Sequence, residues 1–306
     1  MKQKHRMKMS TGEKVFCAVN YIFLASIFVL TLYPLIYVLS ASFSDPVAVA
    51  RGEMILWPIK PSLDGYKFVL KYKEIWSGYA NTIFYTVVGT ILNLLVTLPA
   101  AYALARKDMA GRGFIMTLFI VTMYFSGGLI PMYLNMNSFG LVNTRASMLV
   151  VNLVAAYNLI VARTFFANSI PWELQEAAYL DGANTFKLFV KIILPLSSPI
   201  IVVLTLYYGI NHWNQYFNAM IYLKDRDLFP LQIILKEILT QSQLSAEALS
   251  EGGYSPAEIA EMQRMTEAAN RMKYCVIVMS AAPMLAIYPW LQKYFAKGAM
   301  IGSVKG

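Results

Sequence analysis

Charged residues are scarce in this sequence. Asp, Glu, Lys and Arg make up 14% of the 306 residues, whereas 58% are hydrophobic and the mean hydropathy is +0.50. A soluble domain is usually about 25% charged, so the deficit indicates a membrane protein. Cysteine is scarcer still, and Cys17 and Cys275 both lie in apolar runs. This pattern argues against a disulfide framework, and we expect no metal site.

The middles of the long apolar runs also lack Asp, Glu, Lys and Arg, and His212 is the only ionisable side chain well inside one of them. Ion-driven transporters usually need carboxylates or broken-helix ion sites within the membrane. The sequence also lacks the G-x-x-x-x-G-K-[ST] loop that binds nucleotide phosphates. If the chain moves a solute uphill, the energy must therefore come from another subunit. A membrane enzyme is a poor fit, because no Asp, Glu, His or Cys cluster converges within the spans.

Six apolar runs have the roughly 20 residues that a helix needs to cross a bilayer. The first is too long for the apolar core of a signal peptide, so we expect a retained span. In the third, Gly127, Gly128 and Pro131 predict a kink. The sequence thus predicts an all-α membrane protein with a single transmembrane domain over 1–306. The spans cover residues 15–40, 80–104, 113–134, 146–167, 198–222 and 274–294.

The net charge of +9 reflects membrane topology rather than nucleic-acid binding, because Lys and Arg gather at the ends of the apolar runs. They lie before the first run, after the second and around the link that follows the fourth, which predicts that these segments and both termini are cytoplasmic. Residues 41–79 and 223–273 then form outer loops. We expect a short helix after Asp64, and an amphipathic helix over 229–240 that lies at the membrane surface.

Residues 169–197 form a polar cytoplasmic segment between two apolar runs. Ser169 and Pro171 predict the start of a helix, and Gly182 predicts its end. Thr185 can begin a second helix, and Pro195 breaks the chain as it re-enters the membrane. From these features alone, the segment could equally be an ordinary amphipathic connector between two spans or a helix with a function of its own.

The spacing within this segment resembles the EAA loop of ABC importer permeases, which have a type I fold of six transmembrane helices. In that family the loop forms a coupling helix that docks into an ATPase dimer, where ATP and Mg²⁺ bind. The resemblance implies a second homologous permease and an extracellular or periplasmic solute-binding protein as partners, and no cofactor on this chain. The matching residues are Glu176, Ala177, Ala178, Gly182, Ile192, Leu194 and Pro195.

Other segments resemble the carbohydrate branch of this family, which includes the smaller permease of maltose importers. They are "SIPWELQEAAYLDGA", "NHWNQYFNAMIYLKDRDLFPLQ" and the ending "KYFAKGAMIGSVKG". More narrowly, "FSGGLIPMYL" resembles permeases grouped with oligosaccharide and uronide importers of the lipoprotein-like type. The resemblance implies an oligosaccharide importer in the bacterial cytoplasmic membrane. It also implies that the tail, 295–306, contacts the ATPase, although an ordinary frayed terminus is the alternative. The tail residues concerned are Gly298, Gly302, Ser303 and Gly306.

The fifth span combines aromatic and amide side chains at membrane depth. Sugar rings stack on aromatic faces, and amides bond sugar hydroxyls, so we expect a substrate path here. Hydrogen bonding between helices is the alternative for each residue. We interpret Asn93, Asn152 and Asn158 as packing residues. The predicted path comprises Tyr208, Asn211, His212, Trp213 and Asn214.

Two other functions remain open from the sequence. One is an ABC importer for a non-sugar solute such as an amino acid or phosphate, which the long last outer loop and the maltose-type ending disfavour. The other is a membrane scaffold without a transport role. A scaffold has no need of the EAA spacing, so the loop favours an ABC importer over a scaffold.

Overall fold

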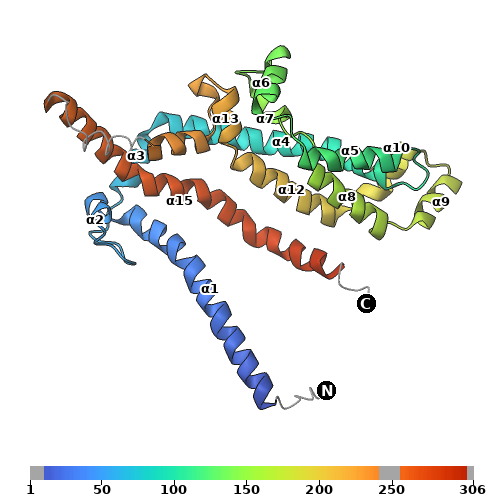
Figure 1. Cartoon of the computed structure of the whole chain (residues 1–306), viewed down its shortest axis with the longest axis horizontal. Coiled ribbons are helices and arrows are strands. Elements are labelled where there is room, and N and C mark those ends of the chain that lie inside the picture. Colours follow the sequence, from blue (N-terminus) through green and yellow to red (C-terminus); the bar gives the residue numbers. More distant parts are fainter. Residues whose placement is uncertain (1–9, 241–255, 302–306) are drawn as a thin grey trace. The chain divides into compact units, whose positions relative to one another are not determined.

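The computed structural model describes residues 10–240 and 256–301, and within these ranges the chain is helical, without strands (Figure 1). The chain divides into two compact units. One comprises Met1–Lys71 and Ile238–Met279, and the other Tyr72–Glu237 and Ser280–Gly306. The all-α prediction is confirmed for the part of the chain that the structure describes.

Two of the described helices are long and apolar enough to cross a membrane by themselves, α1 (Thr11–Phe43) and α4 (Lys73–Ala105). Two bent pairs bring the number to four if each pair is one span. The predicted sixth span falls within α15 (Pro256–Ile301).

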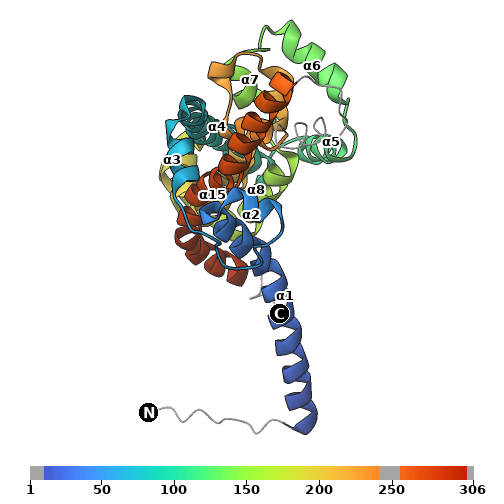
Figure 2. The same ribbon diagram turned by 90° about the vertical axis from the view of Figure 1, so that its left-hand side faces the viewer.

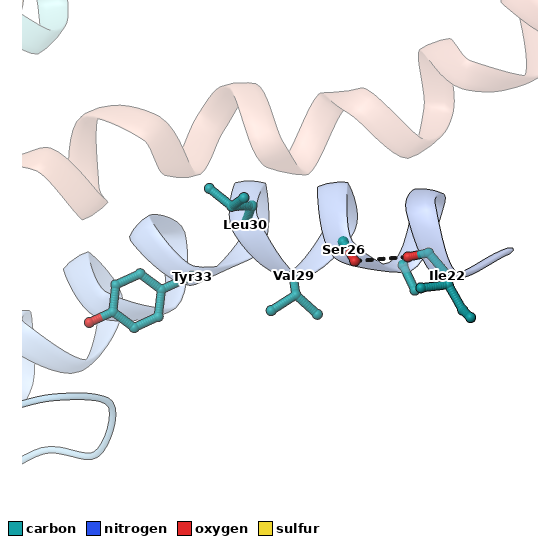
Figure 3. Close-up of a pocket in the computed structure, with 6 residues that line it drawn as sticks. Ile22, Ser26, Val29, Leu30 and Tyr33 are labelled. Carbon is teal, nitrogen blue, oxygen red and sulfur yellow. Dashed lines mark hydrogen bonds between the residues drawn. The ribbon is translucent and has the colours of Figure 1, made fainter. Parts of the chain in front are cut away.

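Most of α1 is exposed in the part of the chain that the structure describes. Its most apolar 18-residue stretch contains no buried residue. A hollow on its surface is lined by Ile22, Ala25, Ser26, Val29, Leu30 and Tyr33, all from α1 itself (Figure 3). The Ser26 hydroxyl donates to the carbonyl of Ile22 at 2.9 Å, so this face requires no polar partner. A helix that is apolar all round suits lipid or a helix of another chain.

The first unit is built around the C-terminal end of α1. Ala41, Val49 of α2 (Pro46–Ala50) and Met54 form a small core. The short helix expected after Asp64 is confirmed as α3 (Asp64–Lys71). A β-carbon on Gly65 would lie 2.7 Å from the carbonyl oxygen of Arg271, so α3 and α15 approach backbone to backbone at this glycine.

The second unit is a bundle in which α4 packs lengthwise against α8 (Ala156–Ser169) and α12 (Ser198–Trp213) (Figure 1). Its core includes Leu98, Leu159 and Leu204. The helices α9 (Trp172–Leu180) and α10 (Thr185–Leu188) lie at one end of this bundle, and α7 (Arg145–Val150) and α13 (Phe217–Tyr222) lie at the other. The chain between α4 and α12 therefore forms helices at both ends of the bundle, with α7 at one end and α9 and α10 at the other.

The kink predicted in the third span is confirmed. Helices α5 (Arg112–Tyr124) and α6 (Leu129–Ser138) meet at an angle of 116° (Figure 2). Gly128 at the joint has φ of +87°, a conformation that residues with a β-carbon rarely adopt.

The fourth span differs from the prediction, because 146–167 is not one helix. The chain breaks between α7 and α8, and Asn152 has φ of +61°. Asn93 of α4 donates from Nδ2 to the carbonyls of Asn152 and Leu153 at 3.2 and 2.7 Å. The backbone N–H of Ala155 donates to the Tyr208 hydroxyl at 3.3 Å. Side chains from neighbouring helices thus satisfy backbone groups that a break within an apolar run would otherwise leave unpaired.

The helix expected near 229–240 is present over residues 231–240, but its apolar face packs on protein rather than facing lipid. Leu231 and Ile234 are buried. The N–H of Leu231 donates to the Thr82 hydroxyl of α4 at 2.8 Å, and Gly78 leaves room for the Ile234 side chain. The rest of the outer loop, up to residue 255, lies outside the described residues.

Candidate coupling loop and substrate path

The predicted coupling helix is α9, at one end of the second unit. It begins after Pro171, whereas Ser169 is the last residue of α8 and not the cap that we predicted. Gly182 ends it with φ of +74°. The N–H groups of Gly182 and Ala183 donate to the carbonyls of Tyr179 and Ala178, which closes the helix in the manner of a glycine C-cap.

The EAA residues divide between two sides of α9. Ala178 is 5% exposed and belongs to the core of the bundle. Glu176 and Ala177 are exposed, as is Gly182. Gln175 is buried and accepts a hydrogen bond from the Tyr102 hydroxyl of α4 at 2.9 Å. One side of the helix is therefore anchored, and the acidic side is free to meet another protein.

The chain continues from α9 into the fifth span through a compact helical bend. Asn184 caps α10 by accepting from the N–H of Lys187 at 2.8 Å, in agreement with the predicted start at Thr185. A π-helical turn (Phe189–Ile193) and α11 (Leu194–Leu196) follow. The segment Thr185–Leu196 makes an angle of 80° with α12.

The break in this bend lies at Ser197, two residues after the predicted Pro195. The Ser197 side chain is fully buried, and its hydroxyl donates to the carbonyl of Ile193 at 2.6 Å. Ile192 and Leu194 are half-buried in the bundle core, whereas Pro195 is exposed. The apolar residues of the motif therefore pack the bend.

Two residues of the predicted substrate path form hydrogen bonds inside the bundle. The Tyr208 hydroxyl lies 2.7 Å from that of Thr97. Nε2 of His212 lies 2.7 Å from Oδ1 of Asn93. Because Nδ2 of Asn93 donates to the fourth span, Oδ1 is the acceptor and His212 carries its hydrogen on Nε2.

The other three path residues differ in exposure. Trp213 is buried, and its Nε1–H donates to the carbonyl of Ser280 at 3.1 Å. Asn211 and Asn214 are exposed on this chain. The structure thus separates the five residues that the sequence grouped together, and only these two asparagines present their side chains outward.

The tail lies mostly beyond the described residues. Gly298 is part of α15, while Gly302, Ser303 and Gly306 lie outside the described ranges. Within those ranges, no group of three His, Cys, Asp or Glu residues could hold a metal ion.

Sequence reasoning missed the residues that anchor α9. Arg106 is one of the basic residues that follow the second apolar run, which predicted topology alone, although its guanidinium contacts Tyr179. A signal was present, because Trp172, Gln175 and Tyr179 recur at i, i+3 and i+7 and so share one face of a helix.

Comparison with known proteins gives close relatives. No protein-family model matches the chain. Protein LplC of Bacillus subtilis is 36% identical over 306 residues, which cover all of both chains. The polygalacturonan/rhamnogalacturonan transport system permease protein YtcP of the same organism is 37% identical over 296 residues, covering 96% of this chain and 99% of the relative.

The structure agrees with these matches. A chain from the crystal structure of a bacterial ABC transporter, one involved in the import of the acidic polysaccharide alginate, has a TM-score of 0.82 and 34% identity. The match covers 94% of this chain and 99% of that chain. Such permeases are transporter subunits of the cell membrane rather than enzymes, and they work with a second permease, an ATPase and a solute-binding protein. The chain belongs to the permease family of ABC importers for sugars.

Proposed function

We propose that this permease couples ATP hydrolysis to oligosaccharide import through residues 169–197. The observation that carries the proposal is the two-sided setting of α9, with Glu176 exposed while Gln175 and Ala178 are buried. A short helix that is fixed on one side can pass on a rigid-body movement of a partner. ATP and Mg²⁺ bind the partner ATPase dimer, and this chain holds no cofactor.

The chain crosses the bacterial cytoplasmic membrane six times, with both termini in the cytoplasm. The distribution of Lys and Arg supports this topology. A second homologous permease completes the translocation path, and the unburied apolar surface of α1 is suited to that permease or to lipid. The outer loops, 41–79 and 223–273, receive the solute-binding protein, and the tail 295–306 contacts the ATPase.

The substrate is an acidic oligosaccharide. Two relatives support this choice, since one is named for polygalacturonan/rhamnogalacturonan transport and the other imports the acidic polysaccharide alginate. On this chain the path runs along Asn211 and Asn214. They share one face of the helical turn with Tyr207, whose ring lies 6.3 Å from that of Tyr157. Aromatic faces beside amides suit a sugar chain.

The test is uptake by the whole complex, purified through a tag on this chain with its partner permease and ATPase and reconstituted with its binding protein. We expect ATP-dependent uptake of a short oligogalacturonide and little uptake of a neutral malto-oligosaccharide of equal length. Uptake of the neutral sugar alone would contradict the acidic substrate but keep the sugar importer. A tagged chain that recovers no ATPase under conditions that preserve such complexes would overturn the importer itself.

A further inference from the structure

One arginine at the end of α4 contacts both ends of the coupling helix. Arg106 is the residue that caps α4. Its guanidinium carbon lies 5.8 Å from the ring centroid of Trp172, the first residue of α9. It lies equally far, 5.8 Å, from the ring centroid of Tyr179, near the last turn of the helix. Both distances are within the range of a cation–π interaction.

Hydrogen bonds fix the guanidinium in this position. Nη1 donates to the Tyr179 hydroxyl at 2.6 Å, and Nε donates to Oδ1 of Asp108 at 2.9 Å. Nη2 also donates to Asp108, so the carboxylate is held by both prongs of the fork. The Arg106 side chain is only 15% exposed, although it carries a charge. The hydrogen bonds from Arg106 lower the pKa of Asp108, so the pair stays ionised at neutral pH.

A second contact lies one turn earlier on α4. The Tyr102 hydroxyl donates to Oε1 of Gln175 at 2.9 Å in a buried setting. Gln175 is on the same face of α9 as Trp172 and Tyr179. This face meets the end of α4, while Glu176 and Ala177 remain exposed. The contacts of Arg106 and Tyr102 therefore leave the acidic side of α9 available.

The same arginine also receives a contact from the third span. Nη1 of Arg112, the first residue of α5, donates to the carbonyl of Arg106 at 3.0 Å. The ends of α4, α5 and α9 thus meet at one residue. A movement of α9 cannot leave α4 behind without breaking the charge-assisted hydrogen bond to Tyr179 and the cation–π contacts with Trp172 and Tyr179.

We propose that Arg106 is a positioning residue that holds α9 to the end of α4, so that a movement imposed on the coupling helix is carried into the second span. This inference rests on the proposed function, since it needs an ATPase that moves α9. Arg106 touches neither sugar nor nucleotide in this role. Lysine cannot replace it, because an ammonium has neither the planar face nor the fixed fork.

The first test compares Arg106→Gln with Lys107→Gln in the reconstituted complex. Lys107 is exposed and lies next to Arg106, so the control removes the same charge at the neighbouring position. We expect Arg106→Gln and Arg106→Lys to lower the sugar transported per ATP hydrolysed by about tenfold, in the range of ordinary coupling energies. Lys107→Gln should match the parent.

The second test measures whether α9 and α4 move together. Spin labels are placed at Leu95 of α4 and at Asp181 at the end of α9, two exposed positions, in a complex whose Cys17 and Cys275 are replaced by serine. The parent should keep one narrow distance distribution with and without ATP, and Arg106→Gln should broaden it. A role of Arg106 in folding alone would leave this distribution unchanged in the assembled variant.

The outcomes separate the two proposals. A parent complex without sugar-stimulated ATPase activity would overturn the proposed function and this inference with it. An active parent together with an equally coupled Arg106→Gln would overturn the inference alone. If Arg106→Gln fails to assemble, Tyr179→Phe keeps the ring and removes one hydroxyl. In that case, if Tyr179→Phe leaves both the sugar transported per ATP and the distance distribution unchanged, the inference about Arg106 is overturned.

Discussion

At the scale of single residues, the polar side chains of Asn93 and His212 bond within the bundle itself. Asn93 accepts from His212 and donates to two carbonyls of the broken fourth span. Each of these groups would be costly to bury without a partner. The interpretation of Asn93 as a packing residue therefore extends to His212, which the sequence had grouped with the substrate path.

Gly89 tests how tightly this network is packed. A β-carbon there would lie 2.5 Å from both Cε1 and Nε2 of His212. The imidazole cannot easily move away, since Asn93 holds it at 2.7 Å. We expect Gly89→Ala to destabilise the permease by about 1–3 kcal/mol through overpacking, measured as a lower melting temperature in detergent.

The matched control is Gly209→Ala, on the facing helix α12. Its β-carbon would meet nothing nearer than the Thr90 hydroxyl at 3.8 Å, which is an ordinary contact. This variant should melt at or slightly above the parent temperature. Adding His212→Ala should relieve the clash in Gly89→Ala. Equal melting temperatures for Gly89→Ala and Gly209→Ala would contradict the packing described here.

At the scale of helices, local signals predicted well and distant partners did not. The end of α9 at Gly182 and the kink at Gly128 follow from glycines that adopt positive φ, and both were predicted. The break after α7 was not, because the groups that stabilise it belong to Asn93 and Tyr208 on other helices. An apolar run shows that a segment can be buried. It does not show where the helix breaks, because the side chains that then bond to its backbone groups belong to other helices.

The same limit applies to the candidate site. The EAA spacing predicts a coupling loop, but it could not show that Ala178 is buried while Ala177 is exposed. The role of Arg106 was hidden for a similar reason. Its contacts reach Trp172 and Tyr179, more than sixty residues along the chain, and a basic residue at the end of a span has a sufficient explanation in topology.

The end of α15 gives a prediction at this scale. Deleting 298–306 removes Gly298, near the end of α15, and the predicted tail beyond it. We expect the truncated chain to assemble with its partners but to support less ATPase activity, since the tail is proposed to contact the ATPase. Full sugar-stimulated activity in the truncated complex would show that the tail is an ordinary chain end.

At the scale of the whole molecule, the chain is a transporter subunit that depends on partners. It has no nucleotide-binding loop in its sequence, and its relatives are permeases of multi-subunit importers. Within the described residues, α1 leaves its apolar surface unburied and α9 leaves its acidic surface exposed. The composition predicted a membrane protein, and the EAA spacing predicted an ATPase partner. The sequence of one chain cannot specify which proteins cover these surfaces.

The most direct measurement of ATP coupling is sugar-stimulated ATPase activity of the reconstituted complex with Glu176→Arg. The charge reversal lies on the exposed side of α9, so the complex should still assemble. Glu13→Arg, at an exposed acid in the first turn of α1, makes the same change in charge outside the proposed docking segments and serves as the control. We predict that Glu176→Arg abolishes stimulation and transport while Glu13→Arg preserves both. Stimulation that survives in Glu176→Arg would contradict the role of this loop.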